Sequence, residues 1–207
     1  MPPDRPTHAR PFRSRPAGWR RLPVAVAAAV ALAAWLPACR ARPEDQALRA
    51  IAGVLRKGDR LIALRAIDPA ATRIAAVIGT AAGKPELRIF EGGGGKKLVL
   101  AHTASQGDGF KNLALQDVDL DGREEIVVTW EGGHLEMIEV IARDPSGAYR
   151  TIFQNAGRQI EARYDAAGRI EFWITSRTYQ EGPRQAPDYE TTVYRWDKGG
   201  YVEAPHP

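Results

Sequence analysis

The segment at positions 117–129 reads Asp117-Val118-Asp119-Leu120-Asp121-Gly122-Arg123-Glu124-Glu125-Ile126-Val127-Val128-Thr129. Aspartates take its first, third and fifth positions, a glycine the sixth and a glutamate the ninth, and β-branched residues follow. Calcium takes six to eight oxygen ligands at about 2.3–2.6 Å, which alternate side chains of a curled loop can supply. Glycine permits the positive φ of a sharp turn. The segment therefore predicts a calcium loop that opens a β-strand.

The loop differs from an EF-hand at two points. Its twelfth position is Val128 instead of a bidentate glutamate, and a strand pattern follows instead of a helix. It resembles the FG-GAP or VCBS repeat of integrin-type propellers, whose loop has the form D-x-[DN]-x-D-G-x-x-[DE] and leads into an apolar strand. The resemblance implies Ca²⁺ as the cofactor. Its implied ligands are the side chains of Asp117, Asp119, Asp121 and Glu125 and the backbone carbonyl of Arg123.

An acidic β-turn without an ion is the alternative interpretation of the same residues. Four carboxylates within nine positions repel one another, and Arg123 is the basic residue among them. Without a cation such a loop should be strained or mobile. Val118 and Leu120 alternate with the acidic positions, so we expect both to face a core.

The chain after residue 60 predicts an all-β domain of consecutive four-stranded antiparallel meanders, a partial or small β-propeller-like array. Alternating apolar residues and turn signals recur throughout. The meanders are expected at 61–102, 111–153 and 158–203, within a β domain spanning 59–204. A β-barrel or sandwich built from the same strands is the alternative. The expected strands are 61–67, 73–79, 86–91, 97–102, 111–116, 126–130, 135–142, 148–153, 158–164, 169–175, 191–196 and 201–202.

One helix is expected before the strands, within a linker region at 40–58. Its first turn has Pro43, which suits that position, and acidic residues that favour the positive end of a helix. An apolar stripe continues to Leu55, basic residues follow, and Gly58 is the expected stop. The predicted helix spans 43–57 and is expected to pack on one edge of the β domain.

Residues 1–38 have the pattern of a signal peptide. Basic residues precede an apolar segment at 24–36, which is too short for the ~20 residues of a membrane span. The segment ends Leu36-Pro37-Ala38-Cys39, which resembles the lipobox of bacterial lipoproteins, and Cys39 is the single cysteine. The resemblance implies acyl chains on Cys39 and an extracytoplasmic, membrane-anchored protein, on the outer membrane where two membranes exist. An ordinary secreted protein and an uncleaved anchor are the alternatives.

The charge is unevenly distributed. Residues 1–39 hold six arginines against one aspartate, whereas residues 40–207 hold 23 basic against 24 acidic residues. The basic pI of about 9.4 thus reflects the segment expected to be largely removed. Since no basic surplus remains to neutralise phosphates, we expect no nucleic-acid partner.

The leading hypothesis is a non-catalytic, lipid-anchored envelope protein whose calcium loop orders a β-repeat and whose surface binds a protein or glycan partner. Tyr179 and Tyr189, at the two ends of a polar loop expected at 176–189, are candidate ligand contacts. One alternative is a hydrolase or lyase acting on envelope polymers, although the sequence shows no nucleophile elbow and no zinc spacing. Another is a structural subunit that self-associates to complete its sheet array.

Overall fold

The computed structural model describes residues 42–93, 96–178 and 188–205. One helix and twelve strands form over these residues, and each strand overlaps one expected from the sequence. The bounds are α2 Pro43–Ala52, β1 Arg60–Ala66, β2 Arg73–Gly79, β3 Pro85–Gly93, β4 Lys96–Ala104, β5 Gly109–Gln116, β6 Glu125–Gly132, β7 Leu135–Arg143, β8 Tyr149–Gly157, β9 Gln159–Tyr164, β10 Ile170–Thr178, β11 Asp188–Asp197 and β12 Gly200–Ala204.

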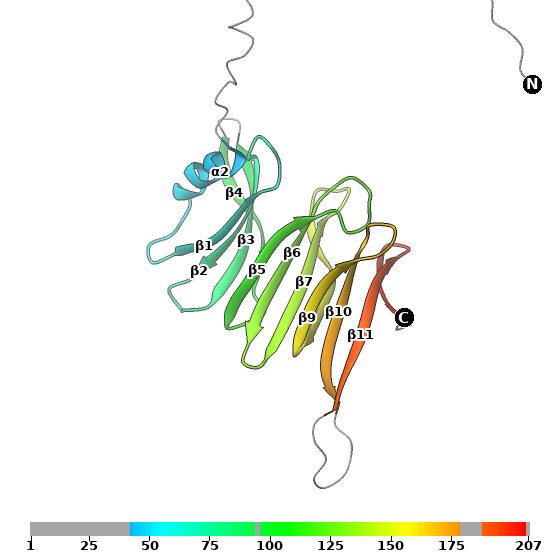
Figure 1. Cartoon of the computed structure of the whole chain (residues 1–207). Helices are drawn as coiled ribbons and strands as arrows, with labels where there is room; N and C mark the ends of the chain where they lie inside the picture. Colours follow the sequence, from blue (N-terminus) through cyan, green and yellow to red (C-terminus); the bar gives the residue numbers. More distant parts are fainter. Residues whose placement is uncertain (1–41, 94–95, 179–187, 206–207) are drawn as a thin grey trace, which may run out of the picture. The chain divides into compact units, whose positions relative to one another are not determined.

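The strands form three separate four-stranded antiparallel sheets (Figure 1). Each sheet is a meander of consecutive strands: β1 to β4 in the first sheet, β5 to β8 in the second and β9 to β12 in the third. The predicted meander fold is therefore confirmed. The described strands do not close into a barrel, which excludes the barrel alternative.

The second sheet lies between the other two, and its central strand β6 explains why. Ile126, Val128 and Trp130 join an apolar cluster with residues of the first sheet such as Leu87. Val127 belongs instead to a cluster with third-sheet residues such as Phe172. Because successive side chains of a strand point to opposite faces, a strand covered on both faces needs an uninterrupted apolar run. The run Ile126-Val127-Val128 meets that need.

Helix α2 covers the outer face of the first sheet. Ala47 and Ile51 are fully buried against Ile74, Ile78 and their neighbours in this sheet. The helix ends at Ala52, five residues before the expected end, with Gly53 as its cap. Glycine is about 1 kcal/mol less favourable than alanine inside a helix, so Gly53 and not Gly58 is where the helix stops.

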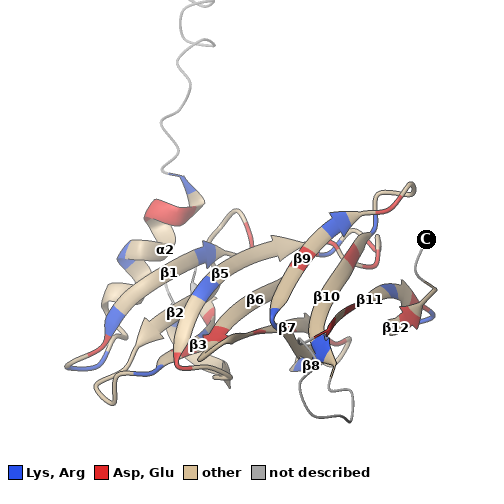
Figure 2. Ribbon diagram, turned by 60° about the horizontal axis from the view of Figure 1, so that its bottom comes forward, with Lys and Arg blue, Asp and Glu red and all other residues tan. Residues whose placement is uncertain are grey.

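The outer face of the third sheet is polar. Glu171 and Trp173 alternate along β10 with the buried Ile170, Phe172 and Ile174 and therefore point away from the core. Glu171 accepts hydrogen bonds from Trp173 Nε1 at 3.1 Å and from Arg195 Nε at 2.5 Å. Acidic and basic positions are interspersed over the strands of all three sheets (Figure 2).

The expected signal peptide and Cys39 lie outside the described residues, so lipidation stays a prediction. Among the described residues, no helix is long and apolar enough to cross a membrane.

Candidate metal centre

The acidic loop connects β5 to β6 in the second sheet. Gln116, the last residue of β5, pairs directly with Glu125, the first residue of β6, so the loop is closed at its base. Gly122 has φ +86°, and a β-carbon there would meet no atom within 4 Å. The glycine is thus required for its backbone conformation and not for space. The sharp turn expected at this position is confirmed.

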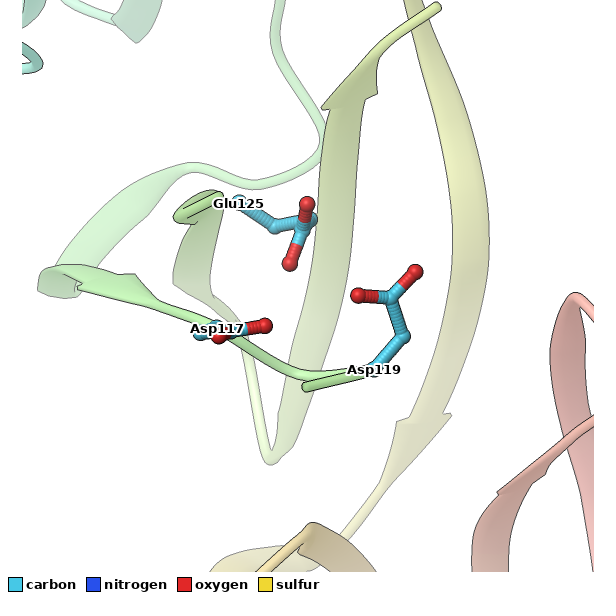
Figure 3. A group of neighbouring side chains, drawn as sticks. All are labelled: Asp117, Asp119 and Glu125. Carbon is cyan, nitrogen blue, oxygen red and sulfur yellow. The ribbon is translucent and has the colours of Figure 1, made fainter. Parts of the chain in front are cut away.

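Three carboxylates of the loop converge. One oxygen from each of Asp117, Asp119 and Glu125 lies within 4.8 Å of the others, and the three side chains face a common space (Figure 3). Glu125 is buried, with 6% of its surface exposed, and the two aspartates are half-buried. The fold therefore gathers three of the four predicted carboxylate ligands.

Backbone amides hold these carboxylates in place. Asp117 accepts hydrogen bonds from the N–H groups of Asp121 at 3.1 Å and Gly122 at 2.9 Å. The Asp121 N–H also donates to Asp119 at 3.1 Å, and the Val118 N–H donates to Glu125 Oε2 at 3.0 Å. The loop is curled around its own acidic side chains, in the manner of an Asx turn.

Asp121 lies apart from the group of three. Its carboxylate accepts a hydrogen bond from the Arg123 N–H at 2.8 Å and lies 3.3 Å from Arg123 Nε. Leu120 differs from expectation as well: it has φ +61° and is 51% exposed, so it does not face a core. Val118, by contrast, is fully buried, as predicted. The curled backbone turns the fourth loop position outward, which strict alternation does not anticipate.

The electrostatics of the loop oppose full ionisation. Burial, together with the charges of Asp119, Asp121 and Asp117, raises the pKa of Glu125 from 4.5 to about 7, although the Val118 N–H acts in the opposite direction. Burial and the charges of Asp121 and Asp117 also raise the pKa of Asp119. A bound cation would relieve this repulsion, because an opposite charge favours the ionised form.

Tyr201, in β12 of the third sheet, also belongs to the surroundings of the loop. Burial and, after it, the charges of Glu125 and Asp119 raise the pKa of its phenol. Its ring contacts Phe153 and Phe172 with centroids 4.7 and 4.9 Å away. The residue lies 76 positions after Glu125. No local pattern could have linked the two, because sheet packing alone brings them together.

The donor set fits a hard divalent cation. All three groups offer carboxylate oxygen, which suits Ca²⁺ and Mg²⁺ better than softer metals. Opposite ligands of Ca²⁺ at 2.3–2.6 Å are about 4.6–5.2 Å apart, a span that accommodates oxygens within 4.8 Å of one another. Mg²⁺ keeps several of its waters and is seldom held by an all-protein cage. The three carboxylates therefore suit a hard divalent cation such as calcium.

The expected polar loop at 176–189 is shorter than predicted. Arg177 pairs with Tyr189 and Thr178 with Asp188, so both ends of the segment extend the hairpin of β10 and β11. Tyr189 is thus a strand residue. Its hydroxyl accepts a hydrogen bond from Arg158 Nη1 at 2.8 Å, and its ring lies 5.1 Å from that guanidinium. Tyr179 lies outside the described residues.

The chain matches no family model, no curated protein and no solved structure. The resemblance of residues 117–129 to an FG-GAP or VCBS repeat therefore stays a hypothesis carried by those residues.

Proposed function

We propose that this chain is a non-catalytic, lipid-anchored extracytoplasmic protein whose loop at 117–125 binds Ca²⁺. The convergence of Asp117, Asp119 and Glu125 at the base of a curled loop carries the proposal. The predicted contributions of Asp121 and the Arg123 carbonyl remain part of the motif-based hypothesis.

The role of the ion would be to order the end of the middle sheet. Val118, between two of the converging aspartates, is packed in the apolar cluster shared with the third sheet. The Asp117 and Glu125 side chains line a cavity that also includes Arg73 of the first sheet. A cation held here would fix a loop that touches both neighbouring sheets, and so would stabilise the domain as a whole.

Thermal unfolding tests this proposal. An ion bound only by the folded state at 100 times its Kd adds about 2.7 kcal/mol of stability, which is about 5–11 °C in Tm for a domain of this size. We expect residues 40–207 to melt higher in calcium than in chelator by an amount of this order. Asp117→Asn should remove the difference.

Asp165→Asn provides the matched control. Asp165 also caps a turn, accepting hydrogen bonds from the Ala167 and Arg169 N–H groups at 2.8 and 2.9 Å, but it lies outside the cluster of three. This variant should lower Tm equally with and without calcium. If the melt of the unsubstituted protein is the same in calcium and chelator, the calcium proposal fails.

Terbium luminescence gives an independent measurement. Tb³⁺ has ligand preferences like those of Ca²⁺. Tyr201 lies near enough to Glu125 and Asp119 for their charges to raise the pKa of its phenol. Excitation through the aromatic absorption band should produce Tb³⁺ emission that calcium displaces. Tyr201→Phe should weaken the emission while leaving calcium affinity unchanged. Emission that calcium does not displace would place the lanthanide elsewhere.

The anchor and the partner are separate parts of the proposal. Cys39 in its lipobox-like context supports lipidation. Metabolic acyl labelling of the full chain should mark the unsubstituted protein and not Cys39→Ala. The membrane anchor, together with a sequence that has no catalytic motif, supports a role in contacting a protein or glycan partner. An unlabelled full chain would contradict the anchor while leaving the calcium proposal intact.

A further inference from the structure

A polar cavity adjoins the acidic loop between the first two sheets. Its volume is about 550 Å³. The β1–β2 connection contributes one wall, and the acidic loop and the end of β7 contribute the others. The lining residues are Ile67, Arg73, Asp117, Gly122, Arg123, Glu124, Glu125, Arg143 and Asp144. Two of them, Asp117 and Glu125, belong to the candidate metal cluster, so a cation held there would border the cavity.

The three arginines of this cavity share one feature. Each meets a protein carboxylate through Nε: Arg73 with Asp68 at 3.4 Å, Arg143 with Glu91 at 2.8 Å and Arg123 with Asp121 at 3.3 Å. Their side chains are 36%, 41% and 68% exposed. The Nη donors of a guanidinium held in this way suit the two oxygens of a carboxylate or phosphate, and those of Arg143 lie beside Tyr149 and Gly147.

The two least exposed of these arginines, Arg73 and Arg143, come from different sheets. Arg73 begins β2 of the first sheet and Arg143 ends β7 of the second. Asp68 is itself fixed by hydrogen bonds from the Thr72 and Arg73 N–H groups at 3.0 and 2.8 Å. The Nε contacts thus orient each guanidinium before any ligand arrives, which lowers the ordering cost of binding.

The charge of the lining depends on the ion. Three arginines face four carboxylates, and each arginine also meets a carboxylate outside the lining, Asp68, Glu91 or Asp121, so the surroundings of the cavity carry a surplus of negative charge that disfavours an anion. A divalent cation on Asp117 and Glu125 adds two positive charges and so lowers this surplus. Calcium also accepts six to eight oxygens, more than the three carboxylates supply as single ligands, so a ligand oxygen can complete the coordination.

We propose that this cavity binds the oxyanion group of an acidic ligand, a carboxylate or a phosphate, and that it does so only when the loop holds calcium. The inference rests on the proposed calcium site and deepens it. Arg73 and Arg143 clamp the oxyanion from opposite walls, and the ion adds positive charge beside them. The acidic loop thereby becomes a recognition element as well as a structural one.

The test is an NMR titration of ¹⁵N-labelled residues 40–207. The signals monitored are the amide chemical shifts of the loop and of Arg73 and Arg143. The probes are glucuronate, inorganic phosphate and, as the neutral control, glucose, each with calcium or with chelator. Glucuronate or phosphate should give saturable shifts with calcium only, and glucose none. The acidic probe that binds more tightly identifies the group recognised.

Substitutions assign the binding to the arginines. Arg73→Gln and Arg143→Gln should each weaken probe binding about tenfold or more, as expected for the loss of a charge-assisted hydrogen bond. Arg73→Lys should retain only part of the probe binding, because lysine keeps the positive charge but lacks the paired N–H donors of a guanidinium. Arg60→Gln, at the exposed far end of β1, is the matched control and should change nothing.

The outcomes separate the two proposals. Absence of calcium binding refutes the calcium site. Calcium binding without probe binding, or probe binding that is equal in chelator, overturns this inference alone. Equal weakening by Arg60→Gln also overturns it, since it would show a diffuse effect of surface charge. A melt with calcium for each variant establishes that a lost signal reflects the cavity and not unfolding.

Discussion

Glu125 is the residue at which burial and charge conflict most strongly. It starts β6, accepts the Val118 N–H and is almost fully buried beside two other carboxylates. Its pKa of about 7 means that the folded, ion-free protein favours the protonated form over a range in which the unfolded chain is ionised. This single side chain therefore links pH to stability and, in the proposed site, to calcium binding.

The ion-free protein should lose stability between pH 4.5 and about 7. Below pH 4.5 Glu125 is protonated in both states, and above about 7 it must ionise in the fold. The raised folded pKa therefore costs stability as pH rises, by about 3 kcal/mol at most, or 6–12 °C in Tm. Melts in chelator across this range should show Tm falling as pH rises.

Glu125→Gln, which keeps an acceptor for the Val118 N–H, should remove this pH dependence of Tm, and saturating calcium should reduce it. An identical slope in the variant would refute the assignment.

Asp117 and Asp121 should differ in their importance for calcium, although the motif treats them alike. Asp117 lies in the converging group, whereas Asp121 faces Arg123. We expect Asp117→Asn to weaken calcium binding by about 100-fold and Asp121→Asn by about tenfold or less, measured by calorimetry, given the ~1.4 kcal/mol per factor of ten. Equal losses would mean that Asp121 turns inward when the ion binds.

At the scale of elements, the connection between α2 and the first sheet depends on the buried guanidinium of Arg88. Arg88 of β3 is 5% exposed and contacts Asp59 Oδ2 at 2.6 Å and Glu86 Oε2 at 2.7 Å. Asp59 also accepts the Arg56 N–H at 3.0 Å, so the segment after the helix is held to the sheet. Burial raises the pKa of Asp59, but the hydrogen bonds from Arg56 and Arg88 outweigh it and lower the pKa overall.

Asp59→Asn should destabilise the domain by about 3–5 kcal/mol, because it leaves a buried guanidinium short of one partner charge. Denaturant unfolding with and without calcium measures the loss, which should be the same in both. Since the folded pKa of Asp59 is lowered, its contribution is present at neutral pH and is lost as pH falls below about 4. Glu86→Gln is the milder control, because Glu86 is 25% exposed. A loss below 1 kcal/mol for Asp59→Asn would show that the contact contributes little.

At the scale of the whole β domain, the stack of three sheets ends differently on its two sides. Helix α2 covers the outer face of the first sheet with apolar contacts. The outer face of the third sheet carries paired charges, Arg195 with Glu171 and Arg163 with Glu161, and the Arg163 guanidinium lies 4.0 Å from the centre of the Trp173 ring. Glu171 is already buried, but stacking a further sheet there would also bury Arg195, Arg163 and Glu161, whose side chains are 37%, 49% and 43% exposed, which is costly.

Residues 40–207 should therefore be monomeric in solution. Light scattering coupled to size exclusion measures the mass directly. Glu161→Leu together with Arg163→Leu would replace an exposed ion pair by apolar surface and should promote association, because large exposed apolar patches drive contacts between chains. A dimer of the unsubstituted protein that dissociates on introducing Trp173→Glu would instead support self-association through this face.

The sequence by itself determined the elements and the turn chemistry. Strand alternation and turn residues are local, so the twelve strands, the three meanders and the conformation of Gly122 followed from neighbouring residues. The end of the helix was misjudged because the apolar stripe continues past Gly53, and the loop before β11 because Thr178 and Asp188 show no strand pattern.

Only the tertiary structure decided what surrounds the acidic loop. Sheet packing brings Tyr201 to Glu125 and places Arg73 and Arg143 around one cavity, although these residues are far apart in the chain. It also exposes Leu120, which a regular alternation would have placed against a core, and leaves Asp121 beside Arg123 instead of among the converging carboxylates. The physical reason is that short-range patterns fix which backbone conformation each segment prefers, whereas the environment of a side chain depends on how whole sheets pack to bury their apolar faces.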